Sequence, residues 1–109
     1  MYDFIFEKFS GDSLDLEIDL LDSVGTPVNL TTITVRFGIG SVITESSSGV
    51  TISTGTPSLG IITINVTYTA MATLTDYQYD LEVETTDSST GVRDTLFVAL
   101  LTLKDNPRG

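Results

Sequence analysis

The stretch Leu14-Asp15-Leu16-Glu17-Ile18-Asp19-Leu20 decides the fold class of this chain. Aliphatic residues and carboxylates alternate along it without a break, and successive side chains of a β-strand point to opposite faces of a sheet. All the aliphatic side chains therefore fall on one face and all the carboxylates on the other. The stretch predicts a strand that is buried on one face and solvated on the other.

The same period of two recurs in three further segments. Their apolar residues are Ile33, Val35, Phe37 and Ile39; Ile62, Ile64, Val66 and Tyr68; and Tyr77, Tyr79, Leu81 and Val83. Turn-forming clusters rich in Gly, Pro, Asp and Ser separate the segments, at residues 22–27, 46–49, 55–57 and 87–91. About seven short strands with turns roughly every ten residues are typical of an antiparallel β-sandwich. The sequence thus predicts an all-β fold.

Only residues 69–74, Thr-Ala-Met-Ala-Thr-Leu, favour a helix. Thr69 is a suitable capping residue, and Met71 and Leu74 lie three positions apart, which is enough for one helical turn but not for a full helix. We expect this turn to close one end of the sandwich between two strands, with Met71 and Leu74 pointing inward.

The length and composition narrow the possible functions. The chain has 109 residues, 40% of them hydrophobic and 18% charged, so residues 1–109 are expected to fold as one domain. It contains no His, Cys or Trp. Disulfides, thiol nucleophiles, zinc sites built from Cys or His, and Ser-His-Asp catalysis are therefore excluded. We expect no catalytic site, no cofactor and no metal centre, and hence no enzyme.

The charge also argues against two classes of partner. Five Lys and Arg residues oppose fifteen Asp and Glu, which gives a net charge of -10. Such a surface repels phosphate, so neither nucleic acid nor an anionic membrane is an expected partner. The N-terminal residues lack the basic and apolar regions of a secretory signal, and no run of 18 apolar residues occurs. We expect synthesis in a cytoplasm and a soluble product.

Several segments resemble a known group of domains. They are Phe9-Ser10-Gly11-Asp12-Ser13-Leu14, residues 22–31, Val35-Arg36-Phe37, and Asp76-Tyr77-Gln78-Tyr79-Asp80-Leu81-Glu82-Val83. In this order they resemble the immunoglobulin-like domains of tailed-phage virion proteins, including the N-terminal domain of the baseplate upper protein. Ser10 departs from the pattern, because that position is often basic in such domains. The final strand is also more apolar than usual.

The resemblance implies an immunoglobulin-like β-sandwich that serves as a structural protein of the virion, made in the host cytoplasm. The implied partners are other virion proteins and further copies of the chain, as a homo-oligomer in the particle. A tail, neck or baseplate component and a capsid decoration or cement protein both remain open. The alternative from a different class is a carbohydrate-binding or adhesive module that recognises a cell surface.

Two acidic ladders are the densest sets of functional groups, namely Asp15-Glu17-Asp19 and Asp80-Glu82-Glu84. We interpret them as solvated strand faces that discourage edge pairing and aggregation. An interface with a basic partner, a calcium site that includes Asp12, Asp15 and Asp87, and carboxylate catalysis are the alternatives, in decreasing order.

Tyr77 or Tyr79 is expected to bond back to the corner before its strand, as a tyrosine often does in this fold, rather than to stack on a sugar. Gly38 and Gly40 are interpreted as marking a bulge or a strand end, because no helix follows them to make a phosphate loop.

The terminal strands supply the candidate interface. Residues 96–101, Leu-Phe-Val-Ala-Leu-Leu, are apolar on both faces, and so are residues 4–6. A two-layer sandwich covers only one face of each sheet, so the other face is expected to meet another chain. In the last strand, the parity that continues from the polar residues Arg93 and Thr95 predicts the docking residues to be Phe97, Ala99 and Leu101. In the first strand the candidate interface residues are Phe4 and Phe6.

Overall fold

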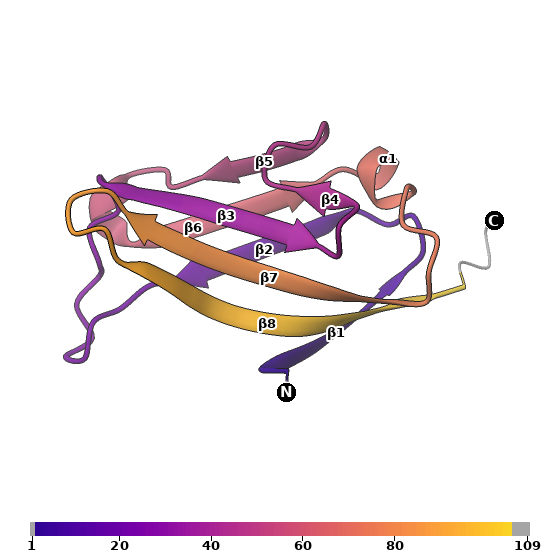
Figure 1. The fold of residues 1–109 in the computed structure, drawn as a ribbon, viewed down its shortest axis with the longest axis horizontal. Coiled ribbons are helices and arrows are strands. Elements are labelled where there is room, and N and C mark those ends of the chain that lie inside the picture. Colours follow the sequence, from indigo (N-terminus) through magenta and orange to yellow (C-terminus); the bar gives the residue numbers. More distant parts are fainter. Residues whose placement is uncertain (1, 106–109) are drawn as a thin grey trace.

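The computed structural model describes residues 2–105 and places the strands in two sheets packed face to face (Figure 1). One sheet has the order β1-β8-β7-β3-β4, with bounds Phe4–Phe9, Arg93–Lys104, Gln78–Asp87, Ile33–Ile39 and Ile43–Thr44. The other has the order β2-β6-β5, with bounds Leu14–Asp19, Ile61–Val66 and Val50–Ser53. All pairs are antiparallel except β1 with β8, which is parallel. The expected all-β sandwich is confirmed.

The core lies between the sheets and contains most of the residues that the alternation predicts to face inward, together with Leu30, Ile43, Met71 and Leu101, which it does not predict. The most completely buried large side chains are Leu30, Ile39, Ile43, Ile62, Ile64, Met71, Leu81, Leu101, Val66 and Val83. Tyr68 is an exception, because β6 ends at Val66 and the chain then turns into a helix that exposes the tyrosine. The prediction that Tyr68 continues the inward face of that strand is therefore wrong. The same prediction for Tyr77 is also wrong, because Tyr77 precedes β7 and is exposed.

A single helical turn, α1 (Tyr68–Met71), closes one end of the sandwich between β6 and β7 (Figure 1). It begins earlier than predicted, because Thr67 rather than Thr69 caps it by accepting a hydrogen bond from the Ala70 N–H at 3.2 Å. Met71 and Leu74 are both buried, as expected. A 3₁₀ turn, η1 (Pro57–Leu59), occupies a connection for which the sequence predicted only a turn.

The corner before β7 is held by a tyrosine. The Tyr79 hydroxyl accepts hydrogen bonds from the backbone N–H groups of Thr75 at 3.0 Å and Asp76 at 2.9 Å. Tyr77 is exposed, so Tyr79 is the residue that fills the predicted role. Gly40 follows the end of β3 with a φ of +55°, and a Cβ there would lie 2.9 Å from Cδ1 of Tyr79. The close approach of this ring thus requires glycine at position 40, as the predicted strand end allows.

The pairing of β7 with β8 contains one irregularity. Val83 pairs with Phe97, whereas the next residue, Glu84, pairs with Thr95. Leu96 is consequently an extra residue in β8, which makes a β-bulge. Odd-numbered residues of β8 therefore face outward before the bulge and inward after it.

Candidate functional site

The bulge corrects the predicted docking face. Phe97 is 9% exposed, and Ala99 and Leu101 are 0% exposed, so all three lie in the core. The predicted outward parity is therefore wrong for these three residues. Thr95 lies on the outer face, as expected, opposite Glu84, but the bulge at Leu96 then turns Phe97 inward and Val98 outward. No docking role through an outward face is available to Phe97, Ala99 or Leu101 in this sandwich.

Phe4 and Phe6, the other two predicted interface residues, lie on β1 against the edge of that core. The ring of Phe97 meets Phe4 edge-on with centroids 5.3 Å apart, and meets Phe6 edge-on at 6.3 Å. Phe4 and Phe6 stack on each other at 6.0 Å. Edge-to-face pairs of this kind stabilise by about 0.5–1.5 kcal/mol beyond the area they bury. The structure thus joins three of the five predicted residues in one aromatic cluster.

The N-terminal strand carries the largest exposed apolar side chains near that cluster. Phe4 is 52% exposed and Ile5 is 68% exposed, and Tyr2 and Phe9 are exposed as well. We call Tyr2, Phe4, Ile5 and Phe9 the β1 patch. These side chains belong to both faces of the edge strand, because Phe4 pairs with the buried Ala99 whereas Ile5 pairs with Leu100 on the outer face. Large apolar side chains exposed along an edge strand are a feature of strands that bind other proteins.

Contacts with β8 hold β1 in place. The backbone N–H of Asp3 donates to Val98 O at 2.7 Å, and the Val98 N–H donates to the Asp3 carboxylate at 2.9 Å. At the other end Lys104 Nζ lies 2.9 Å from Glu7 Oε2, and the hydrogen bond to this carboxylate raises the pKa of Lys104. The patch is therefore presented on an ordered strand.

An apolar groove of about 380 Å³ runs between β1 and β2, where the edges of the two sheets meet. Phe4, Phe6 and Phe97 line one side, and the five residues of β2 from Asp15 to Asp19 line the other. Leu16 and Ile18 are half-buried and face the core, whereas Asp15, Glu17 and Asp19 are exposed. The groove thus has an apolar interior and an acidic rim.

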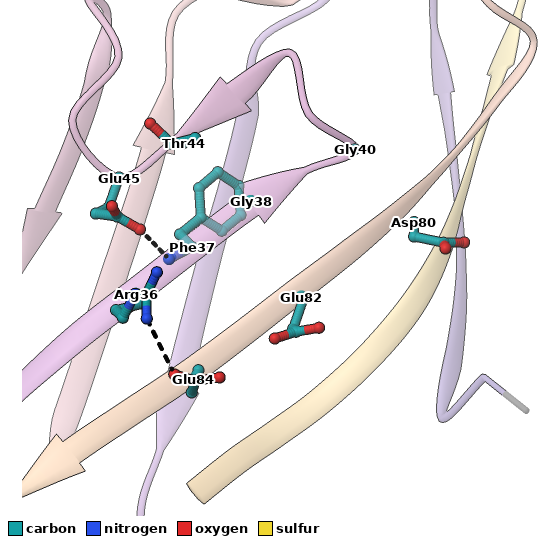
Figure 2. Close-up of a pocket in the computed structure, with 9 residues that line it drawn as sticks. All are labelled: Arg36, Phe37, Gly38, Gly40, Thr44, Glu45, Asp80, Glu82 and Glu84. Atoms are coloured by element: carbon teal, nitrogen blue, oxygen red, sulfur yellow. Dashed lines mark hydrogen bonds and ion pairs between the residues drawn. The ribbon is translucent and has the colours of Figure 1, made fainter. Parts of the chain in front are cut away.

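A second hollow, of about 430 Å³, lies on the outer face of the five-stranded sheet. Figure 2 shows Arg36 beside Glu84, with Glu82 and Asp80 further along β7. Glu84 Oε1 lies 3.6 Å from Arg36 Nη1 and 3.3 Å from Arg93 Nε, and its side chain is only 15% exposed. Two guanidinium groups therefore flank the one partly buried carboxylate of this ladder.

The other acids of this hollow are engaged locally or solvated. Glu45 Oε1 accepts a hydrogen bond from the Phe37 N–H at 3.1 Å, as Figure 2 shows. The Tyr2 hydroxyl donates to Asp80 Oδ1 at 2.5 Å, and this hydrogen bond to a carboxylate raises the pKa of Tyr2. Asp80 and Glu82 are otherwise exposed. The prediction that both ladders lie on outward strand faces is confirmed, with Glu84 as a partly buried member.

The described residues 2–105 contain no group of three or more Asp or Glu placed to hold a metal ion. In particular, Asp87 is occupied in its own hairpin, because its Oδ1 accepts from Thr32 Oγ1, Ser89 N and Ser89 Oγ at 2.7–2.9 Å. No helix within this range is long and apolar enough to cross a membrane.

Sequence reasoning missed the groove and the bulge. The groove depends on which strand edges lie side by side, and no local pattern reports this. The bulge has a weak signal, since Leu96 and Phe97 are consecutive apolar residues that directly follow the polar residues 93–95. Such a doubling also fits a strand covered on both faces, which is how the sequence was interpreted.

The sequence matches no protein-family profile and no curated protein. Among solved structures it is similar to the titin M3 domain, with a TM-score of 0.54 and 13% sequence identity over 95% of each chain. At this identity the similarity speaks for the fold alone. It agrees with the architecture described above, in which two sheets pack face to face around one core. The chain has an immunoglobulin-like β-sandwich fold.

Proposed function

We propose that this chain is a non-enzymatic structural protein of a tailed-bacteriophage virion that acts through protein–protein assembly. Its place would be the tail, neck or baseplate, or the capsid surface as a decoration or cement protein. The phage assignment rests on the sequence resemblance of its turn and core residues. The observation that carries the assembly role is the β1 patch, a set of exposed apolar side chains along an ordered edge strand.

The physical driving force would be burial of this patch. Fully burying a side chain such as isoleucine or phenylalanine stabilises a contact by about 1.5–3 kcal/mol. The acids of the outer hollow offer no comparable driving force for assembly, because each is either paired with a neighbouring group or solvated. The net charge of -10 would keep the free chain soluble until it docks.

The assembly role is tested with Ile5→Ser and a matched control, Val24→Ser. Both side chains are exposed and apolar, but Val24 lies in the turn between β2 and β3, away from the patch. We expect the wild-type chain to self-associate at high concentration or to join its purified particle. Ile5→Ser should weaken this association about tenfold, and Val24→Ser should not. Equal behaviour of the two variants by light scattering would refute a role for the patch.

The virion assignment has its own test. Particles of the source phage, purified by density gradient, should contain the chain at a fixed copy number by quantitative mass spectrometry. Its absence from intact particles would overturn the assignment. A change in tyrosine fluorescence on addition of host cell-wall polysaccharide would favour the carbohydrate-binding alternative instead.

A further inference from the structure

The edge of β2 that faces away from β6 is open in the described part of the chain. β2 is the first strand of the order β2-β6-β5, and no described strand pairs with its other side. One row of β2 backbone N–H and C=O groups is therefore without a strand partner among the described residues. Unpaired edges of this kind are templates for strand addition.

The residues of β2 that present these groups can be identified. The Leu20 N–H donates to Gly60 O at 2.8 Å on the β6 side, and the Thr67 N–H of the β6 segment donates to Gly49 O of the β5 segment at 3.0 Å. Backbone groups alternate between the two sides along an antiparallel strand. Both hydrogen bonds indicate that the even-numbered residues of β2 direct their backbone N–H and C=O groups toward β6. Asp15, Glu17 and Asp19 then direct their N–H and C=O groups to the open edge.

The same three residues carry the acidic rim of the groove. A strand added along this edge would place every second side chain opposite Asp15, Glu17 and Asp19 on the outer face. Its remaining side chains would point inward beside Leu16 and Ile18, toward Phe4, Phe6 and Phe97 in the groove of about 380 Å³. The outward positions favour cations, and the inward positions favour aliphatic side chains.

We propose that the β2 edge binds an extended segment of a partner protein in which basic and apolar residues alternate. The proposal rests on the proposed function and names the partner chemistry that assembly would use. A second copy of this chain does not fit, because its cations, Lys8, Arg36, Arg93, Lys104 and Arg108, include no two that are two residues apart. The acidic rim therefore disfavours a strand from a second copy of this chain and favours a strand with regularly spaced basic residues.

The direct probe is a fluorescent nine-residue peptide that alternates Lys and Val, compared with one that alternates Glu and Val. We expect saturable binding of the Lys peptide, measured by fluorescence anisotropy, with affinity that falls as salt rises. The Glu peptide should not bind. Absence of saturable binding by the Lys peptide would overturn the proposal and leave the acidic rim with a protective role only.

Two variants locate the site. Glu17→Lys reverses the central charge of the rim and should weaken binding of the Lys peptide about tenfold or more, whereas Glu82→Lys reverses a charge on the other sheet and should leave it within about twofold. Circular dichroism of both variants checks that the fold is kept. Equal weakening by both would mean nonspecific attraction to an acidic protein and would refute the proposal.

The backbone pairing is tested without changing the protein. Methylating the nitrogens of alternate peptide residues removes one row of N–H donors, so methylation of either the Lys set or the Val set should abolish binding, and methylation of the other should preserve it. Binding that survives both methylations would exclude strand addition. If no peptide binds but the whole chain still assembles through the β1 patch, this inference fails while the proposed function stands. If the peptide binds but the chain is absent from particles, the proposed function fails while the inference about the β2 edge stands.

Discussion

Glu84 on β7 pairs with Thr95 on β8, one position short of the regular register. The residue before Glu84 already pairs with Phe97, so Leu96 has no partner on β7. This one extra residue decides which side chains of the last strand enter the core. Polar residues 93 and 95 lie on the outer face before the bulge, and Val98 and Leu100 take that face after it.

The face assignment predicts opposite outcomes for neighbouring residues. Phe97→Lys would place a charge in the core and should reduce the free energy of unfolding by about 3–5 kcal/mol, enough to unfold many domains of this size. Val98→Lys should change it by less than about 1 kcal/mol, because Val98 pairs with Glu82 on the outer face. Urea titration followed by circular dichroism measures both. Equal losses would contradict the assignment.

The bulge itself predicts a difference between two deletions. Removing Leu96 leaves Thr95 opposite Glu84 and Phe97 opposite Val83, so register and faces are kept and stability should fall by only about 1–2 kcal/mol. Removing Val98 makes Phe97 and Ala99 adjacent, and one side of the strand must then turn its core residues outward. That loss should exceed about 4 kcal/mol. Thermal melts that rank the deletions in the opposite order would disprove the bulge.

The tyrosine corner predicts a modest cost for one hydroxyl. Tyr79→Phe removes the acceptor for the N–H groups of Thr75 and Asp76 and should destabilise the domain by about 1–2 kcal/mol. Tyr77→Phe makes the same chemical change at an exposed position and should stay within about 0.5 kcal/mol. Denaturant titrations of the two variants give the comparison, and a Tyr77 effect as large as that of Tyr79 would contradict it.

The β7–β8 hairpin should contribute to stability in a pH-dependent way. The Ser89 hydroxyl, the Ser89 N–H and the Thr32 hydroxyl, in that order, donate to Asp87 and lower its pKa from the usual 3.8. A carboxyl whose pKa is lower in the folded state stabilises that state above the unfolded pKa, and this contribution is lost as the pH falls through the folded value. Asp87→Asn should therefore flatten the fall in stability between about pH 5 and pH 2.

The control for this pH effect is Asp19→Asn, which removes one charge from an exposed position on β2. It should leave the slope of stability against pH nearer to that of the wild type. Thermal melts across the pH range measure both variants. Identical profiles for Asp87→Asn and the wild type would show that the hairpin hydrogen bonds have no linkage to folding.

The sequence by itself determined the elements and most of their faces. In β2, β3, β6 and β7 apolar and polar residues alternate strictly. Because successive side chains of a pleated strand point to opposite faces, this local pattern assigns each residue to a face without reference to the rest of the chain. The sequence also predicts the helical turn, the burial of Met71 and Leu74, and the tyrosine at the start of β7, for the same reason. Each depends on residues close together in the chain.

Only the tertiary structure decided the inward side of β8 and the surface where a partner could dock. Residues 96–101 are apolar at both parities, so their own pattern is degenerate, and the choice of face depends on the register with β7 across the hairpin. The groove depends on a parallel pairing that sets β1 beside the open edge of β2, two strands that belong to different sheets. Such neighbours are set by the packing of the whole core, which optimises the total burial rather than any one segment.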